Sequence, residues 1–439
     1  MATEMTKASL LDDGRVLASV IAPTIAKGTI KRRPSVEALA QHHGLDTSAL
    51  QLLQDLRRKY GSEPLLVSIL FRSQVIVLDP KDVEQILLET PEPFSSASKE
   101  KRSALRHFEP GNILIADPEQ RAQLRPVHEH TLATNERIHP LYEHFQAIIN
   151  DELRHVFDSN VDKAEFDIDW TVFAKAWSRI TTRLTLGDSA RDDKDLIETL
   201  DDIRHRANWG FMALTDHSKL DHYQARVSEY LERREEGSLV SRLPKDSNLD
   251  LASQVAQWLF AFDAAALATY RALALLALHP EEQEKAFQEA QQGGADRPLT
   301  RGVFLESLRL WPTTPAILRE LAQDHQINGK TVKKGTGVVI FTPFFHRDNE
   351  KLPFADLLSP EQWKDKEAII EKGLVPFSFG PAICPAHNLV PMISSRVLDG
   401  FLLGGKLGLV APELDPKALP GTLNNFEVKL SLTKRTSSA

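Results

Sequence analysis

The pattern of hydrophobic and polar residues predicts a helix-rich chain with a few short strands. Residues 48–61, "SALQLLQDLRRKYG", have the spacing of an amphipathic helix that ends at a glycine. The runs "LLVSILF" (65–71) and "QVIVLD" (74–79) indicate two paired strands. Residues 249–280, "LDLASQVAQWLFAFDAAALATYRALALLALHP", are apolar on nearly all sides and predict a buried central helix.

The remaining patterns place the central helix within one large domain. We expect a loose N-terminal segment over residues 1–35 and a single domain over 36–439. Residues 91–116 look irregular, whereas 280–292, 303–311 and about 386–403 have helical patterns. The alternation in "NNFEVKLSLTK" (424–434) indicates a strand. The predicted fold class is mainly α with small peripheral β-sheets.

Composition and charge narrow the classes of function. The 439 residues are 42% hydrophobic and 26% charged, with a net charge of −8, which argues against nucleic acid as the main partner. The start of the chain lacks a signal-peptide pattern, and no apolar run looks long enough to span a bilayer. We therefore expect a cytoplasmic protein without membrane insertion.

The chain has one cysteine, Cys384, in the stretch "PFSFGPAICPAHNLV" (376–390). A single cysteine excludes an intramolecular disulfide and Cys-rich metal sites. Three interpretations remain open from the residues alone: a buried structural cysteine, a nucleophile with His387 as its base, and a ligand to a single haem iron. The predicted helix after Cys384 would favour a thiolate through its dipole.

The stretch resembles the haem-binding loop of the cytochromes P-450, whose pattern is Phe-x-x-Gly-x-(His or Arg)-x-Cys-x-Gly. Phe377, Gly380 and Cys384 match in spacing, whereas Ala382 replaces the basic residue and Ala386 replaces the last glycine. The resemblance covers roughly residues 60–432. It implies an α-rich triangular prism around a buried haem b, with Cys384 as the axial ligand of the iron and Phe377 and Gly380 framing the cofactor.

A second motif of the family is Glu-x-x-Arg, present here as Glu306 and Arg309. The i, i+3 spacing on a helix places carboxylate and guanidinium on one face, where they can pair. The resemblance implies that this pair is buried and supports the core next to the haem. The family's third member of the network, an arginine, is replaced by Gln362 in "SPEQW".

Three arginines align with positions that contact the haem propionates in the family. Arg121 and Arg125, in "RAQLR", lie at i, i+4 on a predicted helix and can face the same anion. Arg319 follows the Glu-x-x-Arg helix. Together they are expected to compensate for the missing basic group at Ala382.

The central helix carries the family's distal motif in altered form. Ala261 takes the position of a glycine over the haem, Asp263 that of the acid, and Ala264 that of a threonine that helps to order water for oxygen activation. An acid in an apolar helix needs partners, so Asp263 is a candidate catalytic residue. A substrate hydroxyl, an ordered water or Thr269 are the candidates to replace the hydroxyl missing at Ala264.

The resemblance also places a substrate pocket on the distal side. Its expected apolar lining is Ala261 together with Ile113, Ala265, Ala316, Ile317 and Leu423. The dense basic stretch at 99–106 falls in the loop that covers this pocket, where Lys99, Lys101, Arg102 and Arg106 could attract an anionic substrate such as an aryl phosphate or carboxylate. The alternative is a solvated loop.

The predicted function is that of a soluble, monomeric, bacterial-type haem-thiolate monooxygenase. It would insert one oxygen atom from O2 into a C–H bond of a small organic substrate. No flavin domain or dinucleotide fingerprint was found in the sequence, so electrons from NAD(P)H are expected through a ferredoxin or flavodoxin and its reductase. Two alternatives keep the fold: a peroxide-driven or non-oxygenating haem-thiolate enzyme, and a haem sensor or carrier.

Overall fold

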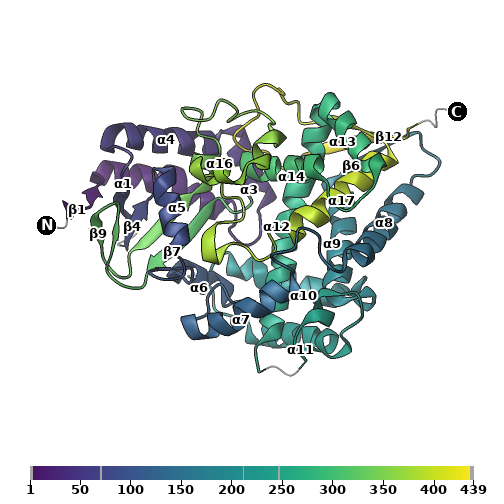
Figure 1. The fold of residues 1–439 in the computed structure, drawn as a ribbon, viewed down its shortest axis with the longest axis horizontal. Helices are drawn as coiled ribbons and strands as arrows, with labels where there is room; N and C mark the ends of the chain where they lie inside the picture. The colour runs from purple at the N-terminus through teal and green to yellow at the C-terminus, as the bar shows by residue number, and fades with distance from the viewer. Residues whose placement is uncertain (1–2, 70–71, 211, 246–247, 436–439) are drawn as a thin grey trace.

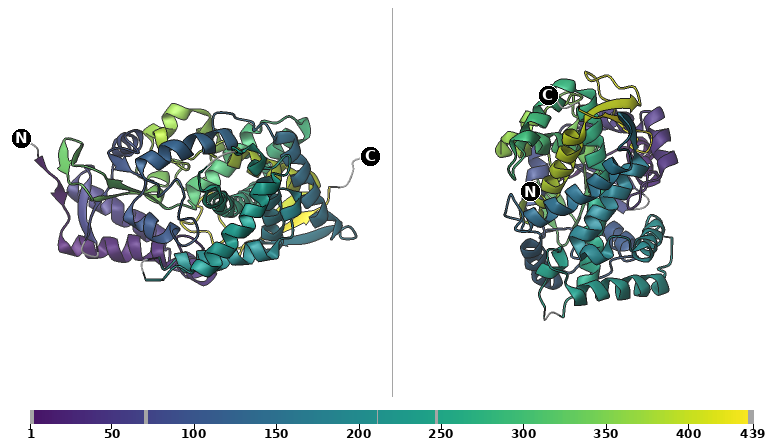
Figure 2. Two further views of the ribbon diagram at one scale, coloured as in Figure 1. Left: turned by 90° about the horizontal axis from the view of Figure 1, so that it is seen from below. Right: turned by 90° about the vertical axis from the view of Figure 1, so that its right-hand side faces the viewer.

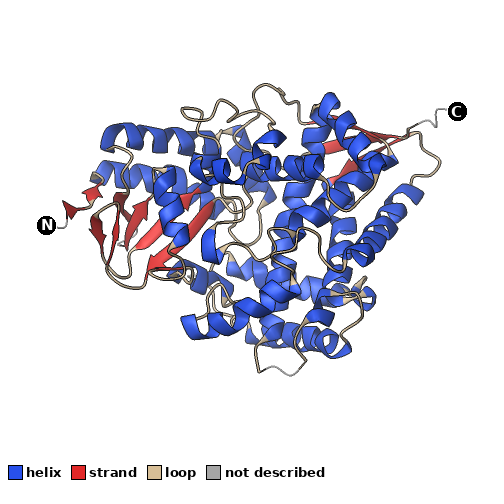
Figure 3. Cartoon of the chain, in the orientation of Figure 1, coloured by secondary structure: helices blue, strands red, loops and turns tan. Residues whose placement is uncertain are grey.

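The computed structural model describes residues 3–69, 72–210, 212–245 and 248–435. Helices form most of the molecule, and the strands gather in two separate regions (Figure 3). The prediction of a mainly α fold with small sheets is confirmed. The helices are α1 (Leu10–Val16), α2 (Ala22–Ala26), α3 (Pro34–His42), α4 (Leu45–Tyr60), α5 (Pro80–Leu88), α6 (Lys99–Leu105), α7 (Pro118–Thr131), α8 (Tyr142–Asp158), α9 (Trp170–Leu186), α10 (Lys194–Ala207), α11 (His217–Arg233), α12 (Leu251–Leu278), α13 (Pro280–Gln292), α14 (Pro298–Leu310), α15 (Thr342–His346), α16 (Lys366–Glu371) and α17 (Leu389–Gly404).

The described strands form three sheets. The largest has the order β2-β3-β4-β10-β7-β5, and the two smaller ones have the orders β1-β9-β8 and β11-β12-β6. The strands are β1 (Thr3–Glu4), β2 (Thr6–Lys7), β3 (Leu65–Ile69), β4 (Arg72–Ile76), β5 (Phe94–Ser95), β6 (Glu165–Asp169), β7 (Ala316–Leu321), β8 (His325–Ile327), β9 (Lys330–Val332), β10 (Gly337–Phe341), β11 (Lys406–Ala411) and β12 (Lys429–Thr433).

The six-stranded sheet brings distant segments together beside the site. The predicted pairing of β3 with β4 is antiparallel, with Ser68 opposite Ser73, while residues 70–71 of the predicted runs lie outside the described residues. Strand β10 pairs in parallel with β4 and antiparallel with β7, which sets Arg319 opposite Val338. Arg319 thus occupies a fixed position on an inner strand.

Helix α12 runs through the middle of the helical region (Figure 1) and packs against α9, α14 and α17. Its backbone is tied to α9 by the Trp177 indole, whose Nε1 donates to the Phe262 carbonyl at 2.8 Å. Among the described helices, α12 is the one whose length and composition would allow it to cross a membrane. Because 78% of its most apolar window is buried inside the protein, it has the character of a core helix.

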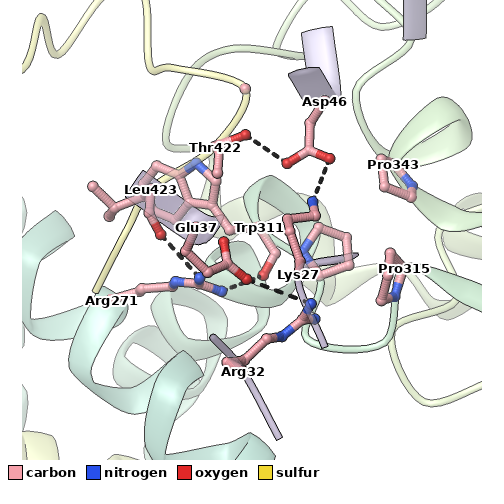
Figure 4. A pocket seen from close by; sticks show the side chains of 12 residues that line it. Lys27, Arg32, Glu37, Asp46, Arg271, Trp311, Pro315, Pro343, Thr422 and Leu423 are labelled. Atoms are coloured by element: carbon pink, nitrogen blue, oxygen red, sulfur yellow. Dashed lines mark hydrogen bonds and ion pairs between the residues drawn. The ribbon is translucent and has the colours of Figure 1, made fainter. Parts of the chain in front are cut away.

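The N-terminal segment is folded, which differs from the loose segment expected for residues 1–35. It contains two short strands, α1, a π-helical turn η1 (Leu17–Ile21) and α2. Figure 4 shows a pocket in which Lys27 donates to Asp46 at 2.5 Å, and Asp46 also accepts from Thr422 near the C-terminus. Arg32 pairs with Glu37 at 3.4 Å in the same pocket. These contacts between distant segments were invisible to local sequence patterns.

A second difference lies in the segment that was expected to be irregular. Helix α6 forms there because the Ser98 hydroxyl caps it by accepting from the Lys101 backbone N–H. Of its side chains, Leu105 is buried, whereas Lys99 and Arg102 are exposed. The helix therefore has one face toward the protein interior and another toward solvent.

Candidate functional site

The loop before α17 connects the two large hydrophobic cores of the protein. Phe377 packs against the core formed by the helices, and Phe379 packs against the core beside the six-stranded sheet. Between Phe379 and Cys384, Gly380 has a φ of 69°, and a Cβ there would lie 2.5 Å from the Leu87 carbonyl of α5. Glycine is required at this position because both the backbone conformation and the close approach exclude a side chain.

Cys384 is held inside this loop by its own backbone. Its N–H donates to the Phe377 carbonyl at 2.9 Å, and the side chain remains partly accessible. Burial raises the pKa of the thiol, against the opposing effects of a hydrogen bond from the Ala386 N–H and the charge of Arg125. Helix α17 begins only at Leu389, so the expectation that a helix start favours the thiolate was wrong. Iron binding would displace the proton, because the thiolate is the form that ligates a metal.

Three cations gather on the same side of the molecule without a carboxylate partner. They are Arg121 on α7, Arg319 on β7 and Lys101 on α6. Burial together with the charges of Arg319 and Arg121 lowers the pKa of Lys101 to about 7, and burial with the charge of Arg121 lowers the pKa of Arg319 to about 10. Within the described residues no carboxylate forms a salt bridge with any of the three. Such a cluster is suited to bind an anionic group.

Sequence reasoning had placed Lys101 with the substrate-attracting cations and so missed this cluster. The signal that could have found it is helical spacing, since Lys101 lies four residues before the buried Leu105 and shares its face. Lys101 is therefore a candidate for the role that Ala382 left open. Arg319 is tied to the cysteine loop as well, because its Nη2 donates to the Ser378 hydroxyl at 3.1 Å.

Arg125 lies between the cysteine loop and the cation cluster. Its Nη1 donates to the Ile383 carbonyl at 2.8 Å, and its Nε donates to Glu129 at 2.6 Å. The guanidinium therefore braces the backbone next to Cys384, and its charge also acts on Arg121. The expected contact of Arg125 with a propionate stays a prediction.

The donor set fits haem. A single soft sulfur on a partly accessible, apolar loop suits one axial iron ligand. The unpaired cations provide sites for the two propionates. On the mostly buried helix α12, the residues Gln257, Phe260, Ala261 and Ala264 keep accessible surface on one face, where small side chains leave room for a flat group.

Asp263 lies in a groove between α9, α10 and α12, beside that face. Arg204 of α10 donates to its Oδ2 at 2.5 Å. The guanidinium is 3% exposed, whereas 60% of the Asp263 side chain is accessible in the groove. Because the groove lies deep in the protein, desolvation still raises the pKa of Asp263 against the effect of Arg204. The acid thus has a partner, as an acid on an apolar helix requires.

The hydroxyl missing at Ala264 is not supplied by Thr269. The Thr269 Oγ1 donates to the Ala265 carbonyl at 2.7 Å and contacts the Ser394 hydroxyl of α17 at 2.9 Å. Both contacts are buried, so this hydroxyl is committed to holding α12 against α17. Of the three candidates to replace the hydroxyl, the two that remain are a substrate hydroxyl and an ordered water.

Glu306 and Arg309 form a fully buried pair on α14. Two guanidinium nitrogens of Arg309 donate to the two carboxylate oxygens at 2.7 Å, and both side chains are 0% exposed. Gln362 takes no part, because its Oε1 accepts from Lys372. The neighbouring Trp363 replaces the missing arginine, with its Nε1 donating to Glu306 at 2.9 Å. The network keeps its hydrogen bonds and loses one charge.

The predicted pocket residues fall into two groups. Ala261 and Ala316 keep accessible surface, whereas four others are buried: Ile113, Ala265, Ile317 and Leu423. Leu423 is 0% exposed and its carbonyl accepts from Arg271 in the pocket of the N-terminal segment, so it lines no accessible substrate pocket. Arg102 and Arg106 are exposed on the outer side of α6.

Replacing Lys101 by methionine is expected to weaken haem binding about 10- to 100-fold, because a charge-assisted contact to a propionate is lost. The affinity of the wild-type apoprotein should also fall as the pH rises above about 7, where the unbound Lys101 becomes neutral and haem binding must take up a proton. Titration of the apoprotein with haem measures both effects.

Haem dimethyl ester supplies the matched control, since it lacks the propionate charges. The wild type should prefer haem over the ester, and Lys101→Met should reduce this preference, whereas Lys99→Met on the exposed face should not. An unchanged preference in Lys101→Met would show that Lys101 does not contact a propionate.

Comparison with known proteins agrees with this geometry. The family model for cytochrome P450 matches residues 34–226 and 218–398. The chain is 29% identical over 174 residues to "Cytochrome P450 4c21" of Blattella germanica, covering 36% of this chain and 34% of that protein. It is 30% identical over 171 residues to "Cytochrome P450 4V2" of Homo sapiens, covering 36% and 33%. It is 29% identical over 193 residues to "(1S)-1-hydroxy-luvungin A synthase CYP88A37" of Citrus sinensis, covering 40% and 39%.

These matches span about a third of the length of the curated relatives. The relatives come from animals and a plant, so the bacterial character and the ferredoxin or flavodoxin partner stay predictions. The family model covers most of the chain, including the cysteine loop, the Glu306–Arg309 pair and the central helix. The chain belongs to the cytochrome P450 family.

Proposed function

We propose that this protein is a haem-thiolate monooxygenase that inserts one oxygen atom from O2 into a C–H bond of a small organic substrate. The single observation that carries the proposal is the placement of the sole cysteine, partly accessible, on an apolar loop at a position that matches the family pattern. Bound haem would supply the one-electron and dioxygen chemistry, which a thiolate ligand favours.

The residues of the chain have separable tasks in this function. Cys384 would be the iron ligand, and Arg125 fixes its loop. The cluster of Lys101, Arg121 and Arg319 would bind the propionates and set the orientation of the macrocycle. Asp263, an acid on α12 held by Arg204, would hold or release a proton beside the accessible face of the helix.

For the substrate we propose an aromatic compound that carries a phosphate or carboxylate group. Support comes from the exposed cations on α6, since Lys99, Arg102 and Arg106 can attract an anion toward the loop that covers the pocket. Lys101 is not counted among these substrate-attracting cations, because the charges of Arg319 and Arg121 act on it. The attraction should therefore act on the association rate and weaken with salt.

A second candidate function is peroxide-driven oxidation on the same fold. The observation that favours it is Ala264, because peroxide chemistry depends less on a distal hydroxyl that orders water. Asp263, retained with a partner, favours the O2-dependent reaction. Electrons for that reaction are proposed to come from NAD(P)H through a separate ferredoxin or flavodoxin with its reductase.

A substrate panel tests these proposals. Aryl phosphates, aryl carboxylates and their neutral parents are titrated into the haem-loaded protein while the spin state of the iron is recorded. We expect spin-state shifts, with tighter binding of the anions at low salt. Equal affinities would exclude the anion preference. Product formation with peroxide alone, compared with an O2, NAD(P)H and partner system, then distinguishes the two functions.

A further inference from the structure

Glu109, which the sequence did not single out, is a fully buried carboxyl group near the distal groove. It lies between α6 and α7 and is 0% exposed. When the Gln257 amide is oriented with its nitrogen toward Glu109, that nitrogen donates to the two carboxyl oxygens at 2.8 and 3.1 Å. The Asn112 Nδ2 also lies 3.4 Å from the Glu109 Oε2. No described residue forms a salt bridge with Glu109. A carboxyl group in such surroundings favours its neutral form.

Arg204 links Glu109 to Asp263. Its Nη1 donates to Asp263, its Nη2 donates to the Ala256 carbonyl at 3.3 Å, and its guanidinium lies 5.7 Å from the ring centre of Phe108, the residue before Glu109. The Arg204 charge acts on Glu109, opposing the effect of burial on its pKa. The Nε of Arg204 is buried and donates to no described protein atom, so one donor is free for a second acceptor.

Tyr223 of α11 completes the cluster. Its hydroxyl is buried without a described partner, and the charges of Arg204, Glu109 and Asp263 all influence its pKa. The titratable and charged groups facing Glu109 are Arg204 from α10, Tyr223 from α11 and Asp263 from α12, while His107 of its own loop is engaged with Gly210 and Thr215.

The cluster also reaches the face of α12 that lacks a hydroxyl. Gln257, Ala261 and Ala264 are spaced i, i+4 and i+7, so they lie on one face of the helix. Gln257 thus connects the Glu109 carboxyl group to the same face as Ala264, one turn beyond Ala261. Arg204 pairs with Asp263 in the groove beside α9 and α10, and Gln257 holds Glu109 on the face of Ala264, so the two acids flank α12.

We propose that Glu109 and Asp263 are alternative carboxyl partners of Arg204, and that a proton moves from Glu109 to Asp263 as Arg204 changes partner. In this exchange an O–H bond of Glu109 breaks and one forms on Asp263. Before it, Glu109 is neutral and Asp263 pairs with Arg204; after it, Glu109 pairs with Arg204 and Asp263 is neutral. The total charge is constant, and neither an oxidant nor a reductant is consumed.

The exchange deepens the proposed monooxygenase function and rests on it, because it would leave a proton on Asp263, the acid that precedes Ala264 on α12. Glu109 would be a positioning residue that acts through Arg204.

Infrared spectroscopy tests the first half of the proposal directly. The spectrum of the haem-loaded wild-type protein minus that of Glu109→Gln at neutral pH should contain the carbonyl stretch of a protonated carboxylic acid, shifted in D2O. Taking the difference removes the signals of other buried carboxyls, such as Asp82 and Asp399, whose pKa values burial also raises. The matched variant Glu198→Gln, on the exposed side of α10, should give no such difference band. Absence of the band from the Glu109→Gln difference spectrum would overturn the proposal whether or not the protein oxidises a substrate.

Turnover tests the second half. In Glu109→Gln, the O2-dependent rate with the partner system should fall by about 100-fold, the lower end of the contribution of a positioned acid. The peroxide-driven rate should be retained, since peroxide brings its own protons. Equal rates in wild type and variant, or an equal loss in both reactions, would contradict the exchange. Absence of O2-dependent turnover in the wild type would instead count against the proposed function.

Discussion

Replacement of Cys384 by serine is expected to abolish the spectroscopic signature of thiolate ligation and O2-dependent oxidation together. Serine keeps the size of the side chain but offers a hard, weakly acidic oxygen in place of a soft thiolate. Because the chain has one cysteine, no second thiol can take its place. The measurements are the absorption spectrum of the reduced protein with carbon monoxide, the haem content and the turnover rate.

The fold of Cys384→Ser should remain intact, because the backbone N–H of residue 384 still donates to the Phe377 carbonyl. Circular dichroism and the unfolding midpoint of the apoprotein provide the control. If the variant retained the thiolate spectrum, the ligand assignment would be wrong. If its apoprotein were unfolded, the loss of haem would carry no information on ligation, and the variant Cys384→Ala would then be needed at lower temperature.

The second large effect is expected from removing Glu306. Glu306→Ala leaves the Arg309 guanidinium as an uncompensated buried charge, although four backbone carbonyls still accept from it. It also leaves the Ser359 N–H and the Trp363 indole without their acceptor. Breaking a buried ion pair from one side costs about 3–5 kcal/mol, so the free energy of unfolding should fall by that amount. Urea unfolding of the apoprotein measures it.

A matched control is the exposed i, i+3 pair of Glu282 and Lys285 on α13. Glu282→Ala should leave the unfolding midpoint nearly unchanged, because solvent screens the interaction. Arg309→Lys should resemble Glu306→Ala, since a lysine cannot reproduce the forked donors of arginine. Equal stability of Glu306→Ala and the wild type would contradict the structural role of the pair.

Long, strongly patterned elements could be predicted from the sequence, and short ones could not. The amphipathic pattern and Gly61 located α4, and the continuous apolar pattern located α12, because each carries its own periodic signal. Helix α6 was missed because its charged residues obscured the one buried position, Leu105. The N-terminal segment was predicted to be loose, because its folded structure depends on contacts with Asp46 and Thr422, which lie far away in the sequence.

In the candidate site, too, residues with local sequence signals could be predicted and residues defined by tertiary packing could not. Cys384, Gly380 and the Glu306–Arg309 pair could be proposed from local spacing, since their roles depend on residues near them in the chain. Lys101 and Glu109 could not be assigned, because their surroundings come from several elements. The charges that lower the pKa of Lys101 belong to α7 and β7, and the amide that holds Glu109 belongs to α12. Burial of a polar residue is a property of tertiary packing.

The three-dimensional structure also shows where other residues can compensate for departures from the family pattern. Trp363 supplies an indole donor in place of the charge missing at Gln362, and we propose that Lys101 supplies the basic group missing at Ala382. Both replacements come from positions that the linear motif does not include. The purple N-terminal strands and the yellow C-terminal strand lie toward opposite ends of the longest axis (Figure 2).

The central claim is that Cys384 ligates a haem iron as a thiolate. The most direct test is the absorption spectrum of the wild-type protein after loading with haem, reduction and exposure to carbon monoxide. The account predicts the red-shifted Soret band of thiolate ligation, with one haem bound per chain. A Soret band at the position typical of histidine-ligated haem, or failure to bind haem at all, would contradict it.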